Sequence, residues 1–352
     1  MAKLLMEGNQ ALAEAAIHAG CRYFFGYPIT PQSEIPEYLS RRLPQVGGVY
    51  LQAESEVSAI NMVFGAAGTG ARVFTASSSP GISLMSEGIS YIAACELPCV
   101  LVNVQRGGPG LGNIAPSQAD YNQATKGIGH GDFHLLVLAP DSVQEMADLT
   151  ILAFDLADKY RNPVMILSDG ILGQMMEPVE FSEEIPEPPV KPWAVTGASG
   201  RKRNIINSLH IAPEVLEARN LKLQTKYAEA KENECRCENY LTEDAELVVA
   251  AFGSCARIAK AAVEEARSQG IKAGLCRPIT VWPFPEAAVA EACENARACI
   301  VTEMNEGQMV YDIRLALKDR IPVHSFGKMG GVIPTPKQIL DEIKKLEVKP
   351  GV

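Results

Sequence analysis

The sequence lacks the features that mark membrane-spanning, secreted or nucleic-acid-binding proteins. It has no uncharged apolar run near the ~18 residues that a spanning helix needs, and its first residues contain no signal-peptide core. Its 32 basic residues form no long block and are outnumbered by 42 acidic ones, for a net charge of −10. We therefore expect a cytoplasmic protein that binds proteins and small molecules, and no nucleic acid or membrane.

The nine cysteines are scattered, and no two form a C-x-x-C pair of the kind found in zinc fingers and ferredoxins. Cys235 and Cys237 form a C-x-C with no further ligand nearby, and His130 and His134 flank an aspartate in a stretch with no helix to align them. We interpret these clusters as reduced thiols and a loop–strand junction, and we predict no metal on this chain.

Several catalytic motifs are also missing. The sequence has no G-x-x-x-x-G-K-[ST] phosphate loop and no G-x-S-x-G nucleophile elbow. Residues 106–113, RGGPGLGN, lack the Rossmann spacing and the acidic residue that should follow ~20 residues later. A stand-alone nicotinamide oxidoreductase is therefore a weak alternative, which reduction of NAD by the pure chain would support.

What the sequence does contain is an alternation of strand and helix patterns in a chain that is 47% hydrophobic. Continuous apolar strands at 73–76, 100–104 and 164–167 alternate with helical patterns such as 56–68 and 142–159. This order predicts an α/β fold built on a doubly wound parallel sheet. At ~100–200 residues per domain, the 352 residues suggest two domains.

Two changes of composition divide the chain. Residues 176–192 hold five prolines and five glutamates, which is typical of a linker, and residues 213–234 form a charged helical segment that we do not expect in the core. A second alternation of strands and helices begins at residue 246. We predict a first domain at 1–190, a linker with a helical segment at 191–240, and a second, smaller α/β domain at 241–352.

Three side chains follow separate strands of the first predicted sheet. Thr30 lies in the turn GYPITP, Glu56 follows QAES and opens an apolar helix, and Arg106 precedes a glycine-rich loop. In parallel sheets ligands bind at the carboxyl ends of the strands, so we expect these loops, and the SSSPG loop at 77–81, at one edge.

Each of these side chains has a chemical and a structural interpretation. Arg106 beside exposed backbone N–H groups suits a planar carboxylate, but it could equally be a solvated side chain in a turn. Thr30 precedes a proline and should be extended with a projecting hydroxyl, although it could form a local turn. Glu56 among apolar neighbours could share a proton with a cofactor ring nitrogen, or simply favour a helix N-terminus.

Together these motifs resemble the alpha subunit of the 2-oxoacid:ferredoxin oxidoreductases. The resemblance extends over nearly the whole chain and keeps the order of the motifs. Within the family, the chain is most similar to the 2-oxoisovalerate (3-methyl-2-oxobutanoate) type, and a 2-oxoglutarate type is the alternative. The resemblance rests on YPITP at 27–31, QAESE at 52–56, FTAS at 74–77 with the SPG that follows, VQRGGP at 104–109 and EMNEGQ at 303–308.

The resemblance implies a thiamine diphosphate enzyme that oxidatively decarboxylates a 2-oxoacid, passes the acyl group to coenzyme A, and sends electrons through iron–sulfur clusters to ferredoxin. It makes the first domain a pyrimidine-binding domain and the second a transketolase C-terminal-like domain. Glu56 resembles the glutamate that contacts the aminopyrimidine ring, with Pro28 and Ile29 also at the cofactor. Thr30 and Arg106 resemble the pair that receives the substrate's carboxylate and keto group.

The sequence has neither the G-D-G motif that helps to hold Mg²⁺ and the diphosphate nor a set of cluster-binding cysteines. The resemblance therefore assigns Mg²⁺ to a beta subunit and the iron–sulfur clusters to companion subunits, with gamma and ferredoxin-like subunits as further partners. We expect no gamma-type domain fused to this chain. A non-catalytic assembly or ligand-binding subunit is the alternative from another class, and the presence of Thr30, Glu56 and Arg106 argues against it.

Overall fold

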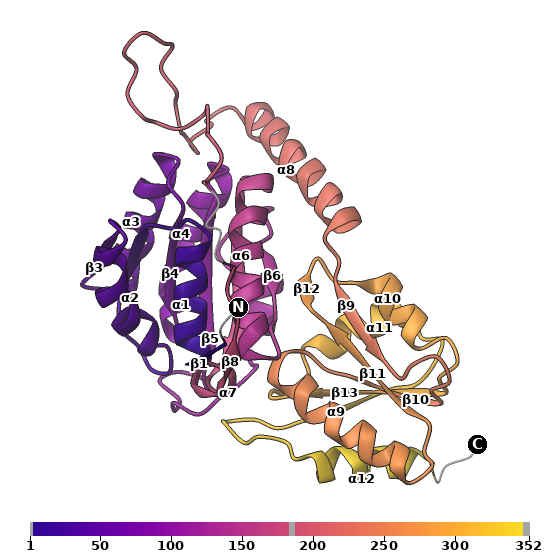
Figure 1. The fold of residues 1–352 in the computed structure, drawn as a ribbon. Helices are drawn as coiled ribbons and strands as arrows, with labels where there is room; N and C mark the ends of the chain where they lie inside the picture. The colour runs from indigo at the N-terminus through magenta and orange to yellow at the C-terminus, as the bar shows by residue number, and fades with distance from the viewer. Residues whose placement is uncertain (1–2, 183–186, 348–352) are drawn as a thin grey trace.

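The computed structural model describes residues 3–182 and 187–347, which form two α/β units (Figure 1). The first unit contains a seven-stranded sheet whose neighbouring strands are all parallel except the first pair. In spatial order its strands are β12 (Thr280–Trp282), β6 (Leu136–Leu138), β7 (Pro163–Asp169), β5 (Cys99–Gln105), β4 (Val73–Ser77), β2 (Tyr23–Gly26) and β3 (Val49–Gln52).

Helices cover this sheet as the fold class predicts. Helix α1 packs on α2 and α6, and α3 packs on α4. Every residue of β4, β5 and β7 is buried, which explains why these strands are continuous apolar runs. The helices are α1 (Gly8–His18), α2 (Glu34–Gln45), α3 (Glu56–Gly68), α4 (Ser79–Ala94), α5 (Tyr121–Thr125), α6 (Val143–Tyr160) and α7 (Gly170–Gln174).

The second unit is built on a five-stranded sheet that is parallel except for its edge strand β9. Its helices pack in pairs, α9 with α12 and α10 with α11. The strands in spatial order are β14 (Val323–Gly327), β13 (Ala298–Glu303), β10 (Leu247–Ala250), β11 (Ala273–Pro278) and β9 (Cys237–Tyr240). The helices are α9 (Gly253–Ser268), α10 (Glu286–Ala292), α11 (Met309–Leu317) and α12 (Pro336–Glu347).

The structure corrects two expectations about the connecting segment. Residues 176–192 are not linker throughout, because β8 (Met176–Val179) pairs antiparallel with β1 (Leu4–Glu7). The charged helix α8 (Pro213–Asn233) does reach the core through buried Leu223, Tyr227 and Ala230. Their spacing of four and three residues puts them on one face of the helix, and the many charges around them obscured that pattern.

One loop of the predicted site edge is partly helical. Helix α4 begins at Ser79, because Pro80 occupies its first turn, where a missing N–H is tolerated. The SSSPG stretch at 77–81, expected as a loop, therefore gives its last three residues to the helix.

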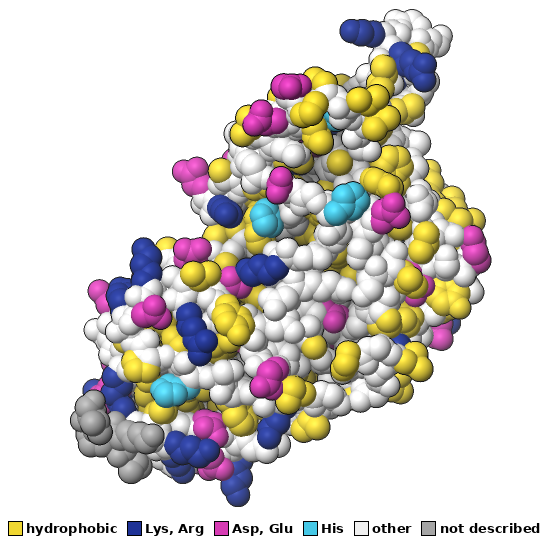
Figure 2. Space-filling model, turned by 180° about the vertical axis from the view of Figure 1, so that it is seen from behind, with side chains coloured by type: hydrophobic (Ala, Val, Ile, Leu, Met, Phe, Trp, Pro, Cys, Tyr) yellow, Lys and Arg dark blue, Asp and Glu magenta, His cyan; other side chains and the backbone are white. Residues whose placement is uncertain are grey.

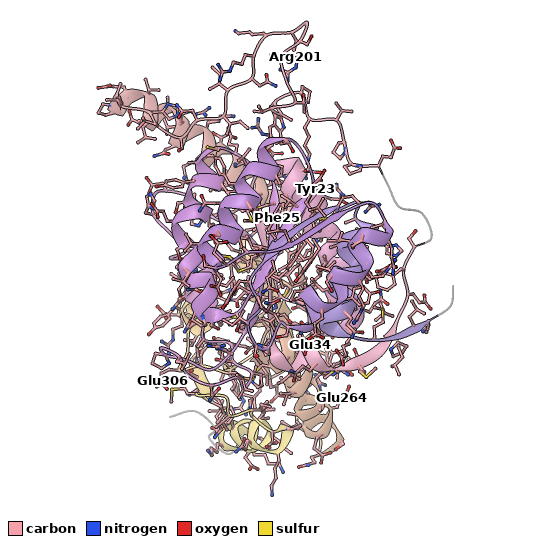
Figure 3. All side chains as sticks on the ribbon, turned by 90° about the vertical axis from the view of Figure 1, so that its left-hand side faces the viewer. Tyr23, Phe25, Glu34, Arg201, Glu264 and Glu306 are labelled. Carbon is pink, nitrogen blue, oxygen red and sulfur yellow. The ribbon has the colours of Figure 1, made fainter. Side chains whose placement is uncertain are left out.

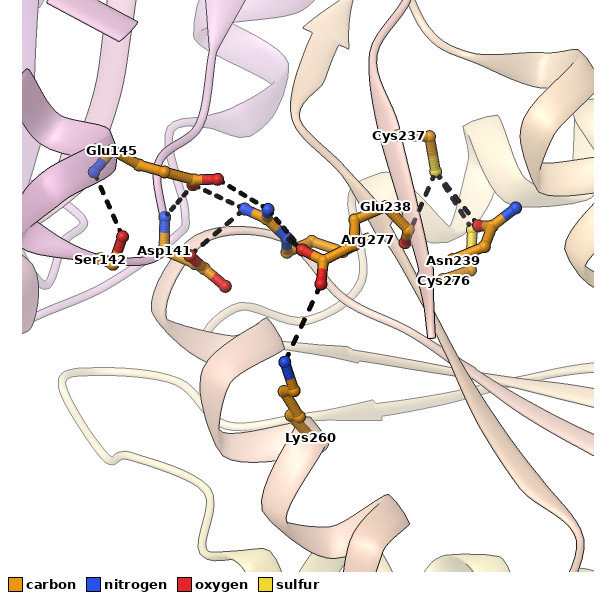
Figure 4. Close-up of polar contacts among 9 residues, drawn as sticks. All are labelled: Asp141, Ser142, Glu145, Cys237, Glu238, Asn239, Lys260, Cys276 and Arg277. Carbon is orange, nitrogen blue, oxygen red and sulfur yellow. Dashed lines mark hydrogen bonds and ion pairs between the residues drawn. The ribbon is translucent and has the colours of Figure 1, made fainter. Parts of the chain in front are cut away.

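The two units are tied together across a polar interface. Strand β12 follows β11 but pairs with β6, so it extends the first sheet. Beside it the buried Arg277 guanidinium binds Glu145 of α6 at 2.7 and 2.8 Å and Glu238 of β9 at 2.6 and 2.9 Å (Figure 4). Burial raises the pKa of the nearby Asp141 to about 6.

The surface is mixed in charge. On the face shown in Figure 2, basic and acidic side chains are interspersed among apolar ones. Within the described ranges, no helix combines the length and the apolar character needed to cross a bilayer.

Candidate functional site

The carboxyl ends of β3, β2, β4 and β5 lie next to one another, because these strands are consecutive and parallel in the sheet. The loops that carry Glu56, Thr30, Ser79 and Arg106 follow them and therefore share one edge, as predicted. Figure 3 shows β2 running from Tyr23 and Phe25 toward Glu34, so this edge faces the second unit. Ligands of open parallel sheets bind at such an edge.

Glu56 is the first residue of α3, and the preceding Ser55 caps the helix by accepting a hydrogen bond from the Ser58 N–H at 3.2 Å. The Glu56 side chain is only 5% exposed. Within the part of the chain that the structure describes, its carboxylate has no hydrogen bond and no ion pair, and its oxygens keep contact with solvent. This largely buried carboxylate is therefore free to accept a hydrogen bond from a group outside the chain.

Gly81 of α4 provides the space that the Glu56 carboxylate occupies. A Cβ atom built on Gly81 would lie 2.5 Å from Glu56 Oε1 and 2.0 Å from Ser77 Oγ. Both distances are too short for real atoms, so no other residue fits here without moving these side chains.

A buried hydroxyl group lies at the same place. Ser77 Oγ lies against the same Gly81 position as Glu56 Oε1, and it has no hydrogen-bond partner among residues 3–182 and 187–347. Unsatisfied buried polar groups are uncommon in folded proteins and need an explanation. Together with the Glu56 carboxylate, it fits a bound polar ring that both donates and accepts hydrogen bonds, such as an aminopyrimidine.

Arg106 brings the loops after β2 and β5 together. Its guanidinium donates from Nη1 to the Thr30 carbonyl at 3.0 Å and from Nη2 to the Leu111 carbonyl at 3.2 Å. The side chain is 7% exposed, and its Nε is buried with no partner in the described residues. Thr30 and the preceding Pro28 are exposed, whereas Ile29 is half-buried. The structure thus places Arg106 directly beside Thr30.

Three polar residues that the sequence analysis did not single out lie behind Arg106. Ser79, Asn103 and Asp120 are hydrogen-bonded to one another, and Ser79 also binds the Arg106 main chain. Burial raises the pKa of Asp120, and the hydrogen bonds from Ser79 and Asn103 partly oppose the shift. No sequence signal distinguishes these residues from ordinary loop residues, since their arrangement depends on contacts between separate loops.

The EMNEGQ motif holds the second unit against this edge. The buried Glu303 carboxylate accepts hydrogen bonds from the backbone N–H groups of Met309 and Val310, at 2.8 and 3.2 Å, and so caps α11. The Met304 backbone exchanges hydrogen bonds with Gln118, which lies in the loop region beyond Arg106. This motif therefore joins the two units beside the site.

The two clusters considered for metals are packed as ordinary side chains. In the described ranges no group of three or more potential ligands converges on one point. The His134 ring stacks on Trp282 at 4.5 Å, and Cys237 Sγ lies 3.6 Å from Cys276 Sγ. A cavity of about 800 Å³ near Trp282 and Phe284 is lined by none of the predicted site residues.

Comparison with known families defines the class of protein. Residues 14–238 match the family described as "Pyruvate flavodoxin/ferredoxin oxidoreductase, thiamine diP-bdg", and residues 245–339 match "Pyruvate:ferredoxin oxidoreductase core domain II". The chain therefore belongs to the pyruvate flavodoxin/ferredoxin oxidoreductase family and is an oxidoreductase chain with a thiamine diphosphate-binding domain.

Two individual relatives are similar to this chain over nearly its whole length. The chain is 52% identical to the ketoisovalerate oxidoreductase subunit VorB of Methanothermobacter marburgensis, over 98% of both chains. It is 38% identical to the 2-oxoglutarate synthase subunit KorA of the same organism, over 96% of this chain and 97% of the relative.

Solved structures show the same fold. The 2-oxoglutarate:ferredoxin oxidoreductase of Magnetococcus marinus, solved with 2-oxoglutarate, coenzyme A and succinyl-CoA bound, superposes with a TM-score of 0.87 at 29% identity. The match covers 97% of this chain and 65% of that longer one. A split-gene transketolase shares the fold at a TM-score of 0.60 and 13% identity.

Proposed function

We propose that this chain is the alpha subunit of a complex that oxidatively decarboxylates 3-methyl-2-oxobutanoate, transfers the acyl group to coenzyme A and reduces ferredoxin. The observation that carries the proposal is the buried, unpartnered Glu56 carboxylate at the edge where Arg106 and Thr30 meet. Family membership and the thiamine diphosphate-binding domain support it.

Arg106 and Thr30 form the substrate end of the proposed site. A guanidinium can bind a carboxylate through two parallel N–H···O bonds, and each Nη of Arg106 has a second N–H beyond the one that it gives to a backbone carbonyl. The adjacent Thr30 hydroxyl can donate to the keto oxygen. This pair orients the 2-oxoacid, so that its carboxylate is fixed before it is lost as CO₂.

Glu56 forms the cofactor end. Thiamine diphosphate, when bound, supplies the electron sink that a 2-oxoacid decarboxylation needs. Glu56 would hold a proton between its carboxylate and a ring nitrogen, and Ser77 and the Pro28–Ile29 segment would help to hold the ring. The low exposure of Glu56 would strengthen its hydrogen bond.

The preference for a branched, apolar substrate rests on two observations. Identity to the ketoisovalerate subunit is 52%, against 38% to the 2-oxoglutarate subunit. Leu111 and Ile114, on the loop that binds the Arg106 guanidinium, are exposed and apolar. The same reaction on 2-oxoglutarate is the second candidate, because the Magnetococcus marinus structure holds that substrate.

The rest of the catalyst belongs to partner chains in this proposal. The sequence contains no G-D-G motif, so a beta subunit would hold Mg²⁺ and the diphosphate, and gamma and ferredoxin-like subunits would carry the iron–sulfur clusters. All nine cysteines are free thiols, which suits a cytoplasmic complex.

Purification of the native complex tests the proposal. We expect the chain to co-purify with a G-D-G-containing chain and a cysteine-rich chain, and the complex to reduce a viologen dye when given 3-methyl-2-oxobutanoate and coenzyme A. Reactions without coenzyme A or without 2-oxoacid serve as controls. A higher kcat/KM for 2-oxoglutarate would reverse the substrate assignment, and no dye reduction with any 2-oxoacid would refute the function.

A further inference from the structure

A closed set of hydrogen bonds lies behind Arg106. The Arg106 N–H donates to Ser79 Oγ at 3.1 Å, and the Ser79 hydroxyl donates to Asp120 Oδ2 at 2.6 Å. The Ser79 N–H donates to Asn103 Oδ1 at 3.1 Å, and Asn103 Nδ2 donates to the same Asp120 oxygen at 2.9 Å. Ser79, Asn103 and Asp120 therefore form a ring, with the Arg106 main chain attached to it.

Ser79 adopts an unusual backbone conformation for a residue with a side chain. Its φ is 21°, on the positive side that favours glycine, although the residue starts helix α4 and is 9% exposed. Such conformations persist where the surroundings fix them, and they gather at functional sites. Here the side chain and the backbone N–H of Ser79 are both held by the ring, which shows what fixes the conformation.

The ring is attached where Arg106 leaves its strand. Arg106 immediately follows the last residue of β5, Gln105, whose Oε1 accepts a hydrogen bond from the Asp120 N–H at 3.1 Å. The far end of Arg106 binds the carbonyls of Thr30 and Leu111. A shift of the Arg106 main chain would therefore move its guanidinium relative to Thr30.

We propose that Ser79, oriented by Asp120 and Asn103, is a positioning residue that sets the place of the Arg106 guanidinium and thereby the affinity for the 2-oxoacid carboxylate. This inference rests on the proposed function, in which Arg106 binds that carboxylate. Ser79 acts through Arg106 and touches no reacting atom.

Two variants of Ser79 separate positioning from stability. Ser79→Ala removes the hydroxyl and keeps the strained backbone, whereas Ser79→Gly removes the hydroxyl and suits a positive φ. In the assembled complex, we expect both variants to raise KM for 3-methyl-2-oxobutanoate about tenfold. A change of this size matches the loss of one or two hydrogen bonds. We expect kcat to change less than about twofold and KM for coenzyme A to stay constant, since the lost interaction with the 2-oxoacid is equally strong in the bound substrate and in the transition state.

Controls make the result specific. Ser86→Ala removes a hydroxyl from the same helix, where it bonds only to carbonyls of α4, and should leave both constants unchanged. Asp120→Asn keeps the shape but removes the charge of the acceptor that binds Ser79 and Asn103, and should raise KM in the same direction as Ser79→Ala. A melting temperature that falls for Ser79→Ala but not for Ser79→Gly, with KM raised in both, separates positioning from folding.

A double-mutant cycle completes the test. If Ser79 acts through Arg106, the effect of Ser79→Ala on KM should largely disappear in an Arg106→Lys background. Additive effects, or an unchanged KM in both Ser79 variants of a complex whose wild type is active, would overturn the inference and leave the proposed function intact. A wild-type complex that oxidises no 2-oxoacid would overturn the proposed function and this inference with it.

Discussion

Replacing Gly81 with alanine should disable the site while leaving the domain folded. The new methyl group would lie 2.5 Å from Glu56 Oε1, against an ordinary carbon–oxygen contact of about 3.4 Å, so the carboxylate must move by about 1 Å. Misplacing a catalytic group by that distance can cost about 100-fold in rate. We therefore expect kcat of the assembled complex to fall about 100-fold.

The effect on stability should be modest. Overpacking a core position typically costs about 1–3 kcal/mol, out of a total of about 5–15 kcal/mol for a domain, so most molecules stay folded. The matched control is Gly65→Ala on the neighbouring helix α3, where a Cβ would meet nothing within 4 Å. The Gly65→Ala variant should keep full activity, and its free energy of unfolding should rise by about 0.5–1 kcal/mol. Viologen reduction and urea denaturation measure the two quantities, and full activity in Gly81→Ala would refute the reasoning.

Three further outcomes are expected. Arg277→Ala should lower the free energy of unfolding by about 3–5 kcal/mol, because it leaves Glu145 without its buried partner; a loss below about 1 kcal/mol in urea denaturation would contradict this. Burial lowers the pKa of His134 below the 6.5 of an unfolded histidine. The free energy of unfolding should therefore be highest above pH 6.5 and should decline as the pH falls below that value. The fluorescence of Trp282, which stacks on His134, would follow denaturation at each pH. His134→Phe should flatten that slope, and a slope that persists unchanged would exclude His134 as its source. Arg106→Lys should raise KM for the 2-oxoacid at least tenfold, since lysine lacks the planar fork, and an unchanged KM would remove Arg106 from carboxylate binding.

Much of the fold could be predicted because local pattern and tertiary structure agree. Strands β4, β5 and β7 are buried on both faces, so their sequences are apolar throughout and easily recognised. Helix α3 was predicted over 56–68, as found, because Ser55 caps its start. The short strand β12 was missed, since it is defined by pairing with the distant β6 rather than by its own three residues.

The residues of the candidate site also differ in how well the sequence could predict them. Thr30, Glu56 and Arg106 could be singled out because each follows a strand in a parallel sheet, and topology alone brings such residues to one edge. The contributions of Gly81 and Ser79 depend on distances between side chains of different loops, which no periodicity records. The roles of Thr30, Glu56 and Arg106 in catalysis stay predictions.

The turnover of an assembled complex that carries Glu56→Gln decides whether this buried carboxylate drives the reaction. Glutamine keeps the size of the side chain and removes its capacity to hold the proton. We expect kcat to fall at least about 100-fold, the scale of general acid–base catalysis, with subunit assembly unchanged. Glu54→Gln, at an exposed carboxylate two residues earlier, should retain wild-type turnover. Oxidation of 3-methyl-2-oxobutanoate at the wild-type rate by Glu56→Gln would contradict the proposed role of this edge of the sheet.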